Sequence, residues 1–338
     1  MGKGHIFRIV CGAMIAIIVV ILVALFVSDD NKNQTVNVNL DVPYSDTNTW
    51  MSYLSDDSYI SEITIPGTHN SCARYVSLDY MNRCQSTSIT QQLEDGYRFL
   101  ELKVAIDENE EGNRIKLVNG SANCHKSGKL FSGYLYFEDV CDEIFKFLQQ
   151  YSTETVIVNV KIDDKEHSVS DVEKMLKDIL DTNKDYWYTE DEIPTLGEVR
   201  GKAVLALGFP DKARLGLAGI NTVWKDQSNK VPADIPYELY VYDNYRLWVQ
   251  DRYNYSVEDK YEAVVDGLEN CEADDRTLFF NYVSTTGDGK IGHPQGYANE
   301  LNDLLLKYDL KDETSYGIVI VDFGNIDLAR HFYYTNLS

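Results

Sequence analysis

The sequence predicts an α/β protein, an irregular TIM (β/α)8 barrel preceded by an N-terminal transmembrane helix. Strand-like runs alternate with helix-period segments, and residues that could carry chemistry stand where strands end. A run of 19 uncharged residues lies near the amino terminus. Alternating strands and helices favour a parallel sheet, and function at the carboxyl ends of strands is typical of a barrel. The 338-residue chain leaves room for one barrel of about 250 residues.

The uncharged run is Ile9–Val27, IVCGAMIAIIVVILVALFV. As a helix of about 1.5 Å per residue it spans about 28 Å, close to the hydrocarbon thickness of a bilayer. Lys3 and Arg8 precede it, so the positive-inside rule places residues 1–8 in the cytoplasm. We expect a single-pass signal anchor with an extracellular catalytic domain. A cleaved signal peptide, which would leave a secreted protein, and a buried core helix are the alternatives.

Two further segments follow the predicted anchor. Residues 28–48 are polar and are expected to form a stalk, and residues 49–338 are expected to form one catalytic barrel. The expected strands cover residues 60–65, 99–106, 155–162, 203–209, 239–249, 277–283 and 316–323. The expected helices cover residues 137–151, 169–180, 192–201 and 294–308.

Composition excludes several classes of protein. The chain has 31 Lys and Arg against 54 Asp and Glu, a net charge of −23, which argues against nucleic acid as a partner. The same charge argues against electrostatic docking on an anionic lipid surface. Five cysteines follow the anchor; Cys72–Cys84 and Cys124–Cys141 are the local pairings to try first, although spacing leaves the connectivity open. No CxxC motif supports a zinc site.

His69 is the histidine whose position indicates chemistry, because it follows a strand-like segment ending in Pro66-Gly67-Thr68. Its neighbourhood, Trp50–Asp57 with Ile63–Ser71 and then Gln91–Lys103, resembles the opening of the X domain of phosphatidylinositol-specific phospholipase C. The resemblance continues in order through Cys124-His125, Glu154–Lys161, Arg200–Leu205, Val249–Tyr253 and Ile320–Phe323. It covers about residues 49–335 and is closest to the compact, bacterial-type, single-domain enzymes.

This resemblance implies an irregular barrel and a defined reaction. The inositol 2-hydroxyl attacks the phosphodiester of phosphatidylinositol, which gives diacylglycerol and an inositol cyclic phosphate. By position, His69 resembles the general base, His125 the general acid and Asp322 the carboxylate that orients the base. Histidine suits both proton transfers because its pKa lies near working pH. Lys103 matches the position that clamps the phosphate.

The resemblance also implies a set of substrate-binding residues. Asp251, Tyr253 and Lys161 match positions that hold the inositol ring. Asn70 and Glu101 stand where the bacterial enzymes have Asp, and Asn70 cannot raise the pKa of a nearby imidazole by charge. Lys103 replaces an Arg, which loses bidentate geometry and keeps the charge. Gly208 stands where an inositol-contacting Arg is expected, and Lys212 or Arg214 from the next loop is the candidate replacement.

Asn70 and Glu101 also resemble two calcium ligands of the metal-dependent branch of the family. That branch has acids at the positions of Lys103 and Lys161, and two ammonium groups there would repel a divalent ion. We therefore expect no metal and no cofactor, with calcium as the alternative.

The expected partners are phosphatidylinositol or a related inositol phospholipid and the membrane that holds the anchor. The loop Ser284–Tyr297 contains no Trp, so we expect the catalytic domain to adsorb weakly to lipid and to depend on the anchor. Two other functions stay open. One is a related phosphodiesterase acting on another phospholipid or on a glycosyl-phosphatidylinositol anchor; the other is a non-catalytic surface protein that binds lipid or glycan.

Overall fold

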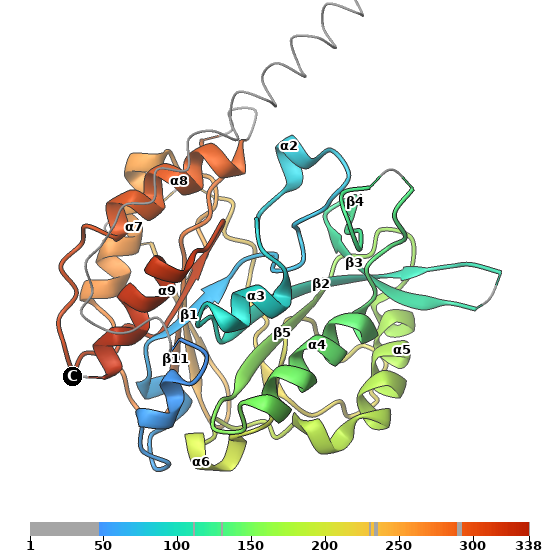
Figure 1. Cartoon of the computed structure of the whole chain (residues 1–338), viewed down its shortest axis with the longest axis horizontal. Coiled ribbons are helices and arrows are strands. Elements are labelled where there is room, and N and C mark those ends of the chain that lie inside the picture. Colours follow the sequence, from blue (N-terminus) through green and yellow to red (C-terminus); the bar gives the residue numbers. More distant parts are fainter. Residues whose placement is uncertain are drawn as a thin grey trace, which may run out of the picture. The chain divides into compact units, whose positions relative to one another are not determined.

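The computed structural model describes residues 47–110, 112–129, 131–229, 231–232, 236–288 and 293–337 (Figure 1). The predicted anchor at 9–27 and all but the end of the predicted stalk at 28–48 lie outside the described residues. Within the described ranges, no helix combines the length and apolar character that a membrane span requires.

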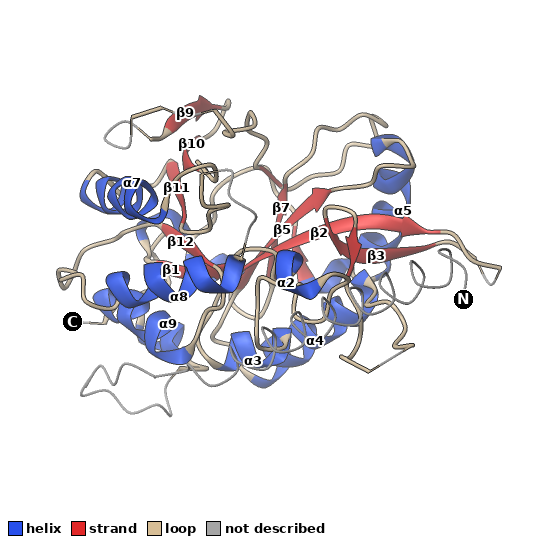
Figure 2. Cartoon of the chain, turned by 90° about the horizontal axis from the view of Figure 1, so that it is seen from above, coloured by secondary structure: helices blue, strands red, loops and turns tan. Residues whose placement is uncertain are grey.

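A curved sheet of parallel strands forms the centre of the fold, in the order β7–β5–β2–β1–β12–β11–β10. These strands are β1 (Ile65–Thr68), β2 (Phe99–Asp107), β5 (Val156–Ile162), β7 (Ala203–Leu207), β10 (Arg246–Gln250), β11 (Thr277–Tyr282) and β12 (Ile318–Val321). All neighbours in this series pair in parallel. Viewed from above, the strands curve around a common centre with helices outside them (Figure 2). The TIM-like α/β barrel expected from the sequence is confirmed.

The barrel is irregular at its last seam. Among the described residues, no strand pairing joins β7 to β10, and side chains connect the two sides instead. Tyr245 Oη accepts a hydrogen bond from Asn221 N at 2.6 Å, and Gln227 Nε2 donates to Val249 O at 3.2 Å. Short strands complete the sheet: β3 (Arg114–Asn119), β4 (Ala122–Asn123), β6 (Trp187–Tyr188), β8 (Ile220–Asn221) and β9 (Glu238–Val241).

Helices cover the outer face of the sheet. They are α2 (Asp79–Asn82), α3 (Ile89–Glu94), α4 (Phe137–Gln150), α5 (Val169–Thr182), α6 (Leu196–Val199), α7 (Val257–Glu269), α8 (Pro294–Leu305) and α9 (Ile326–Tyr333). Side-chain caps start several of them: Ser88, Ser168, Ser256 and Asn325 each accept a backbone N–H from the first turn. α4 and α5 lie close to the expected ranges because their apolar residues recur with helical period.

Three parts of the prediction need correction. Residues 60–62 form a 3-10 turn, so β1 begins only at Ile65. The single strand expected over 239–249 is an antiparallel hairpin of β9 and β10, because Tyr242–Tyr245 reverse the chain. The expected helix at 192–201 is the short α6. The strand β3 and the helices α7 and α9 were not expected.

The cysteine pairings are also wrong. Cys72, Cys84, Cys124, Cys141 and Cys271 are all free thiols in the structure. The first four are buried between the sheet and its covering helices, where they act as small apolar side chains. Burial raises the pKa of Cys124 to about 12.

One glycine is required by close packing at the end of β1. A Cβ on Gly67 would lie 2.8 Å from Cδ1 of Phe99 on the neighbouring strand, closer than real Cβ atoms approach. Gly67 therefore lets β1 and β2 run side by side up to the residue that precedes His69.

Candidate active site

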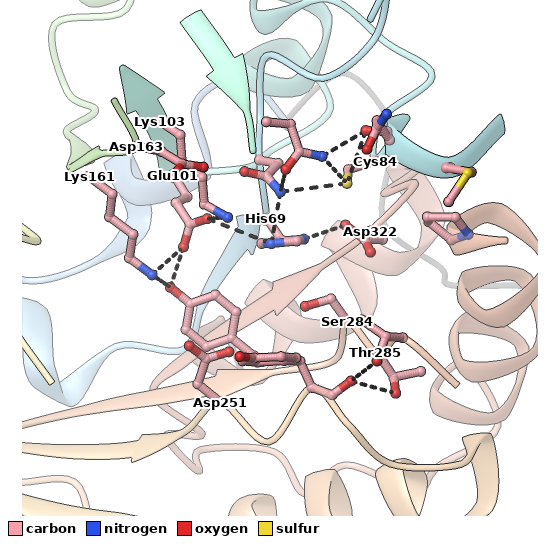
Figure 3. A pocket seen from close by; sticks show the side chains of 18 of the residues that line it. His69, Cys84, Glu101, Lys103, Lys161, Asp163, Asp251, Ser284, Thr285 and Asp322 are labelled. Carbon is pink, nitrogen blue, oxygen red and sulfur yellow. Dashed lines mark hydrogen bonds and ion pairs between the residues drawn. The ribbon is translucent and has the colours of Figure 1, made fainter. Parts of the chain in front are cut away.

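A cavity of about 580 Å³ opens at the carboxyl ends of the parallel strands (Figure 3). The residues that line it come from the ends of β1, β2, β3, β5, β10, β11 and β12 and from the loops that follow them. It gathers eight of the nine predicted site residues, which are His69, Asn70, Glu101, Lys103, Lys161, Asp251, Tyr253 and Asp322.

Strand register places His69 beside Asp322. Thr68 of β1 pairs with Val321 of β12, so the next residue of each strand emerges at the same level. His69 Nδ1 lies 2.8 Å from Asp322 Oδ1. Because a carboxylate accepts, Nδ1 carries the proton and Nε2 carries a lone pair that points into the cavity. Asp322 is buried, whereas the His69 side chain is 19% exposed and open to a substrate.

Asn70 lies against the basic nitrogen of His69. Its Nδ2 is 3.0 Å from His69 Nε2 and 3.0 Å from Asn119 Oδ1. Asn70 has a φ of 43°, in the left-handed region, which Asn and Asp tolerate better than most residues. The Oδ1 atom of Asn70 is buried and makes no hydrogen bond.

Glu101 is the centre of a charged cluster beside His69, whose Nε2 lies 3.7 Å from Glu101 Oε1. Its carboxylate lies 2.7 Å from Lys161 Nζ and 3.6 Å from Lys103 Nζ, and it accepts from Tyr282 Oη at 2.7 Å. Burial alone would raise the pKa of Glu101, but Lys161, Lys103 and His69 outweigh burial and hold this pKa well below its usual range. The carboxylate therefore stays ionised and fixes both ammonium groups at the cavity wall.

Another wall of the cavity is formed by the segment after β10. Asp251 accepts from Trp224 Nε1 at 3.1 Å, and its own N–H donates to Gln227 Oε1 at 2.7 Å. Tyr253 Oη donates to Asp226. Underneath, the ammonium of Lys260 donates to Gln250 Oε1 and to Arg252 O at 2.8 and 3.1 Å. Complete burial lowers the pKa of Lys260 to about 7 despite the nearby carboxylates of Asp251 and Asp322.

Gly208 has a steric role at this wall. A Cβ at this position would lie 2.6 Å from Cγ of Lys161, so any side chain here would displace the lysine. Neither Lys212 nor Arg214 lines the cavity among the described residues. The positive charge on this side of the cavity therefore comes from Lys161, which also lies 4.4 Å from the centre of the Trp224 ring.

The structure does not bring His125 to His69. After β3, the chain turns at Gly120-Ser121 and β4 runs back along β3, with Asn119 paired to Ala122 and Cys124 N bonded to Leu117 O. This reversal carries His125 into a separate hollow beside Tyr134 and Phe131. There its Nδ1 bonds Ser132 O at 3.1 Å and its Nε2 lies 3.3 Å from Ser77 Oγ. His125, predicted as the general acid, therefore does not line the cavity that holds His69.

Asn119 occupies the cavity where the second histidine was expected. It ends β3, its Oδ1 accepts from Asn70, and its Nδ2 donates to Asn82 O at 2.8 Å. The turn after it is held to the end of β5, since Gly120 N donates to Asp163 at 2.9 Å. The sequence analysis missed Asn119; its signal was the alternating run Ile115–Leu117 that ends in Asn-Gly, a common turn dipeptide.

Two groups of atoms bear on metal binding. The donor atoms of His69, Cys84 and Asp322 lie within 4.8 Å of one another. His69 and Asp322 already bond each other, and the Cys84 thiol faces the amides of Asn70 and Asn119 at 3.7 and 3.6 Å. Of the two residues that resemble calcium ligands, Glu101 lies beside two lysines, whose charge opposes a cation.

An apolar rim flanks the mouth of the cavity. On and before α2, Leu78, Tyr80 and Met81 are 78%, 42% and 52% exposed, and Met81 also lines the cavity. Sequence reasoning looked for such side chains in the loop at 284–297 and missed this short helix, because four residues carry no periodicity.

Comparisons with known proteins agree with this geometry. The family model "Phosphatidylinositol-specific phospholipase C, X domain" matches residues 60–207. A 1-phosphatidylinositol phosphodiesterase from Listeria monocytogenes is 27% identical over 292 residues, covering 82% of this chain and 81% of the relative. A protein of the same description from Staphylococcus aureus is 25% identical over 296 residues, covering 81% and 88%.

Solved structures show the same fold. A Staphylococcus aureus phosphatidylinositol-specific phospholipase C superposes with a TM-score of 0.70 at 21% identity, covering 87% of this chain and 99% of that one. The Listeria monocytogenes enzyme superposes with a TM-score of 0.64 at 23% identity, covering 86% and 98%. Residues 60–207 thus match the X domain of phosphatidylinositol-specific phospholipase C, and the chain is similar to enzymes of that description along most of its length.

Proposed function

We propose that this chain is a phospholipase C-type phosphodiesterase that cleaves phosphatidylinositol to diacylglycerol and an inositol cyclic phosphate. The observation that carries the proposal is the His69–Asp322 pair, which shares one cavity with the ammonium groups of Lys103 and Lys161. A base and positive charge in one site are what an intramolecular attack on a phosphodiester requires.

His69 acts as the general base in this proposal. Its Nε2 takes the proton of the inositol 2-hydroxyl while that oxygen attacks phosphorus. Asp322 holds the ring by its Nδ1 proton and stabilises the imidazolium that forms, as a buried carboxylate does in hydrolase triads. The amide of Asn70 must leave Nε2 when the hydroxyl arrives, because both compete for the same lone pair.

Lys103 and Lys161 bind the phosphate oxygens. Glu101 fixes both side chains from below, so their charge is in place before the substrate enters. One carboxylate, that of Glu101, pairs directly with both ammonium groups, so these groups can still attract the oxygens of the developing phosphorane. Positive charge from the protein replaces the charge that a divalent ion would bring, and we propose that the reaction needs no metal.

Asp251 and Tyr253 hold the inositol ring on the far wall. Asp251 offers a carboxylate to vicinal hydroxyls, and the Tyr253 ring lines the cavity beside it. Two hydrogen bonds, from Asp251 N to Gln227 Oε1 and from Lys260 Nζ to Arg252 O, fix this segment before binding, which reduces the entropy lost when the sugar docks.

The predicted single-pass anchor at 9–27 is part of the proposal. Its support is the length of the uncharged run and the basic residues before it. It would hold the barrel beside the outer leaflet at millimolar effective concentration. A chain beginning at Asn48 should then cleave a water-soluble inositol phosphodiester as well as the full chain, and vesicles more slowly.

The test is turnover of phosphatidylinositol in mixed micelles, with the cyclic phosphate followed by phosphorus NMR, in the presence and absence of EDTA. Product formation that persists with EDTA is the expected result. Loss on chelation with rescue by calcium would make Asn70 and Glu101 metal ligands. Binding without any product, with headgroup intact, would favour the non-catalytic alternative, and product from another headgroup would favour the related phosphodiesterase.

A further inference from the structure

We propose that this site has a base but no side-chain acid for the leaving oxygen, and that Asn119 is the residue that sets this specificity. The preferred substrates are then inositol phosphodiesters whose leaving group departs as a stable anion, such as a phenolate or an enolate. The inference rests on the proposed function and narrows the substrate class of the same site.

The first step is an inventory of proton donors. Among the described residues that line the cavity, His69 is the one histidine, and it serves as base. The carboxylates there accept hydrogen bonds: Asp163 from Gly120 N, Asp251 from Trp224, and Asp226 from Tyr253. None of these contacts offers a proton to a departing alkoxide.

The remaining titratable donors are the lysines, Tyr253, Tyr282 and Cys84, and they hold their protons tightly, since burial raises the pKa of the Cys84 thiol and of Tyr253. Lys103 and Lys161 are ion-paired with Glu101, and Tyr282 donates its hydroxyl to the same carboxylate. Burial alone would lower the pKa of Lys103, but the Glu101 charge outweighs it and raises this pKa above its usual value. Burial and Glu101 raise the pKa of Tyr282 as well. Lys165 points to solvent with a 71% exposed side chain and pairs with Asp163.

The second step is the position of Asn119. Its side chain reaches the cavity beside Asn70, which in turn contacts His69 Nε2, so three polar side chains follow one another with 3.0 Å contacts. Residue 119 is thus one side chain away from the reacting base. An amide at this place can position an oxygen, but it cannot protonate one. His125, which could, lies in the separate hollow.

The reaction balances without an acid. The 2-hydroxyl oxygen forms a bond to phosphorus, its proton goes to His69 Nε2, and the bond from phosphorus to the leaving oxygen breaks. That oxygen departs with the electron pair as an anion and takes a proton from water. His69 then returns its proton to solvent. An alkoxide such as that of diacylglycerol leaves slowly by this route, whereas a phenolate needs no proton.

The experiment measures kcat/KM of the full chain for water-soluble inositol 1-phosphodiesters with leaving groups from alkyl to nitrophenyl. We expect kcat/KM to fall steeply from the nitrophenyl ester to the alkyl ester. The fall should be larger than in a site with two histidines by roughly 10²–10⁴-fold, which is the usual contribution of a general acid. The matched variant pair is Asn119→His alone and Asn119→His with Asn70→Asp. The double variant gives the new imidazole a carboxylate partner, and its alkyl-to-nitrophenyl ratio should rise by at least about tenfold.

Asn119→Gln keeps an amide and should leave the alkyl-to-nitrophenyl ratio as in the wild type. This variant therefore shows whether the effect of Asn119→His comes from a new acid or only from a larger side chain. His125→Ala should also leave the ratio unchanged. Since the Asn119→His variants could fold poorly, imidazolium buffer added to the wild-type enzyme is a second measurement, expected to speed the alkyl ester more than the nitrophenyl ester.

The outcomes are separable. Cleavage of the nitrophenyl ester with slow alkyl turnover supports both the proposed function and the inference. Similar rates for both leaving groups, or a loss of alkyl turnover in His125→Ala, would overturn the inference while the proposed function stands. Turnover of neither ester would overturn the proposed function itself.

Discussion

Two walls of the cavity are built in different ways. The wall of β1 and β12 carries His69 and Asp322 directly after two parallel strands, so backbone register sets the distance between them. The wall of the β3–β4 hairpin carries Asn119 at a turn, and its strand returns away from the cavity with His125. Parallel strands deliver neighbouring side chains to one edge of a sheet, whereas one hairpin turn decides which of two polar residues reaches the site. The position of the base therefore depends on strand register in the barrel, whereas the residue at the hairpin wall depends on a single turn.

The largest expected effect separates the two histidines. His69→Ala should lower turnover of phosphatidylinositol by roughly 10²–10⁴-fold, because it removes the general base. His125→Ala should stay close to wild type. Both are measured by initial rates of cyclic phosphate formation, with circular dichroism to confirm the fold. A comparable loss in both variants would mean that the hairpin wall rearranges around substrate.

Asp322→Asn tests the orienting role within the first wall. The amide can donate to His69 Nδ1 and so favour the wrong tautomer, and we expect a loss on the order of 10²-fold in kcat with little change in KM. The pH profile of kcat should also shift, because the imidazolium loses its carboxylate partner. An unchanged kcat and pH profile would mean that Asp322 has only a structural role at the end of β12.

The variant Glu101→Gln tests how much the ion pairs of Glu101 with the two lysines contribute to the free energy of unfolding. The pKa of Glu101 is lower in the folded chain than its unfolded value, so its ion pairs stabilise the fold above the usual carboxyl pKa. That contribution is lost as pH falls through the lowered folded value. At pH 7 the variant should lose about 1–3 kcal/mol in urea denaturation, since both lysines keep some contact with water.

The matched control is Glu262→Gln, an exposed residue of α7, which should change stability little at any pH. Between neutral and acidic pH, the difference in stability between wild type and Glu101→Gln should shrink. A difference that grows toward acidic pH would contradict the assigned direction of the Glu101 pKa.

The smallest expected effect concerns the apolar rim. Leu78 is 78% exposed beside the mouth of the cavity, and Leu78→Ser should reduce turnover on vesicles about tenfold by removing part of one side chain's burial in lipid. Turnover of a water-soluble inositol phosphodiester should not change. Val241→Ser, on β9 and 73% exposed, is the control and should change neither. If wild type and Leu78→Ser cleave lipid in vesicles at equal rates, the anchor alone would account for adsorption to the membrane, as the sequence predicts.

The prediction succeeded where local pattern and chain order carry the information. The strands β7 and β12 were found because strands buried on both faces read as continuous hydrophobic segments, and β2, β5 and β11 because apolar residues predominate in them. It failed at turns: residues 239–249 bend into a hairpin, and Gly120-Ser121 reverse the chain before His125. Turns of two to four residues carry too few side chains for periodicity, and hydrogen bonds from elsewhere hold them, such as Asp163 on Gly120.

The sequence by itself determined the barrel class, the charge that excludes nucleic acid, and the strand-end residues His69, Asn70, Glu101, Lys103, Lys161, Asp251, Tyr253 and Asp322 of this site. Most of them follow or end a strand, whereas Glu101 and Lys103 lie within β2, and parallel strands bring all of them to one cavity. Only the tertiary structure decided which polar residue of the β3–β4 hairpin faces His69, that Gly208 makes room for Lys161, and that the cysteines stay unpaired. Those outcomes depend on register and on contacts between residues far apart in the chain, and a linear pattern contains neither.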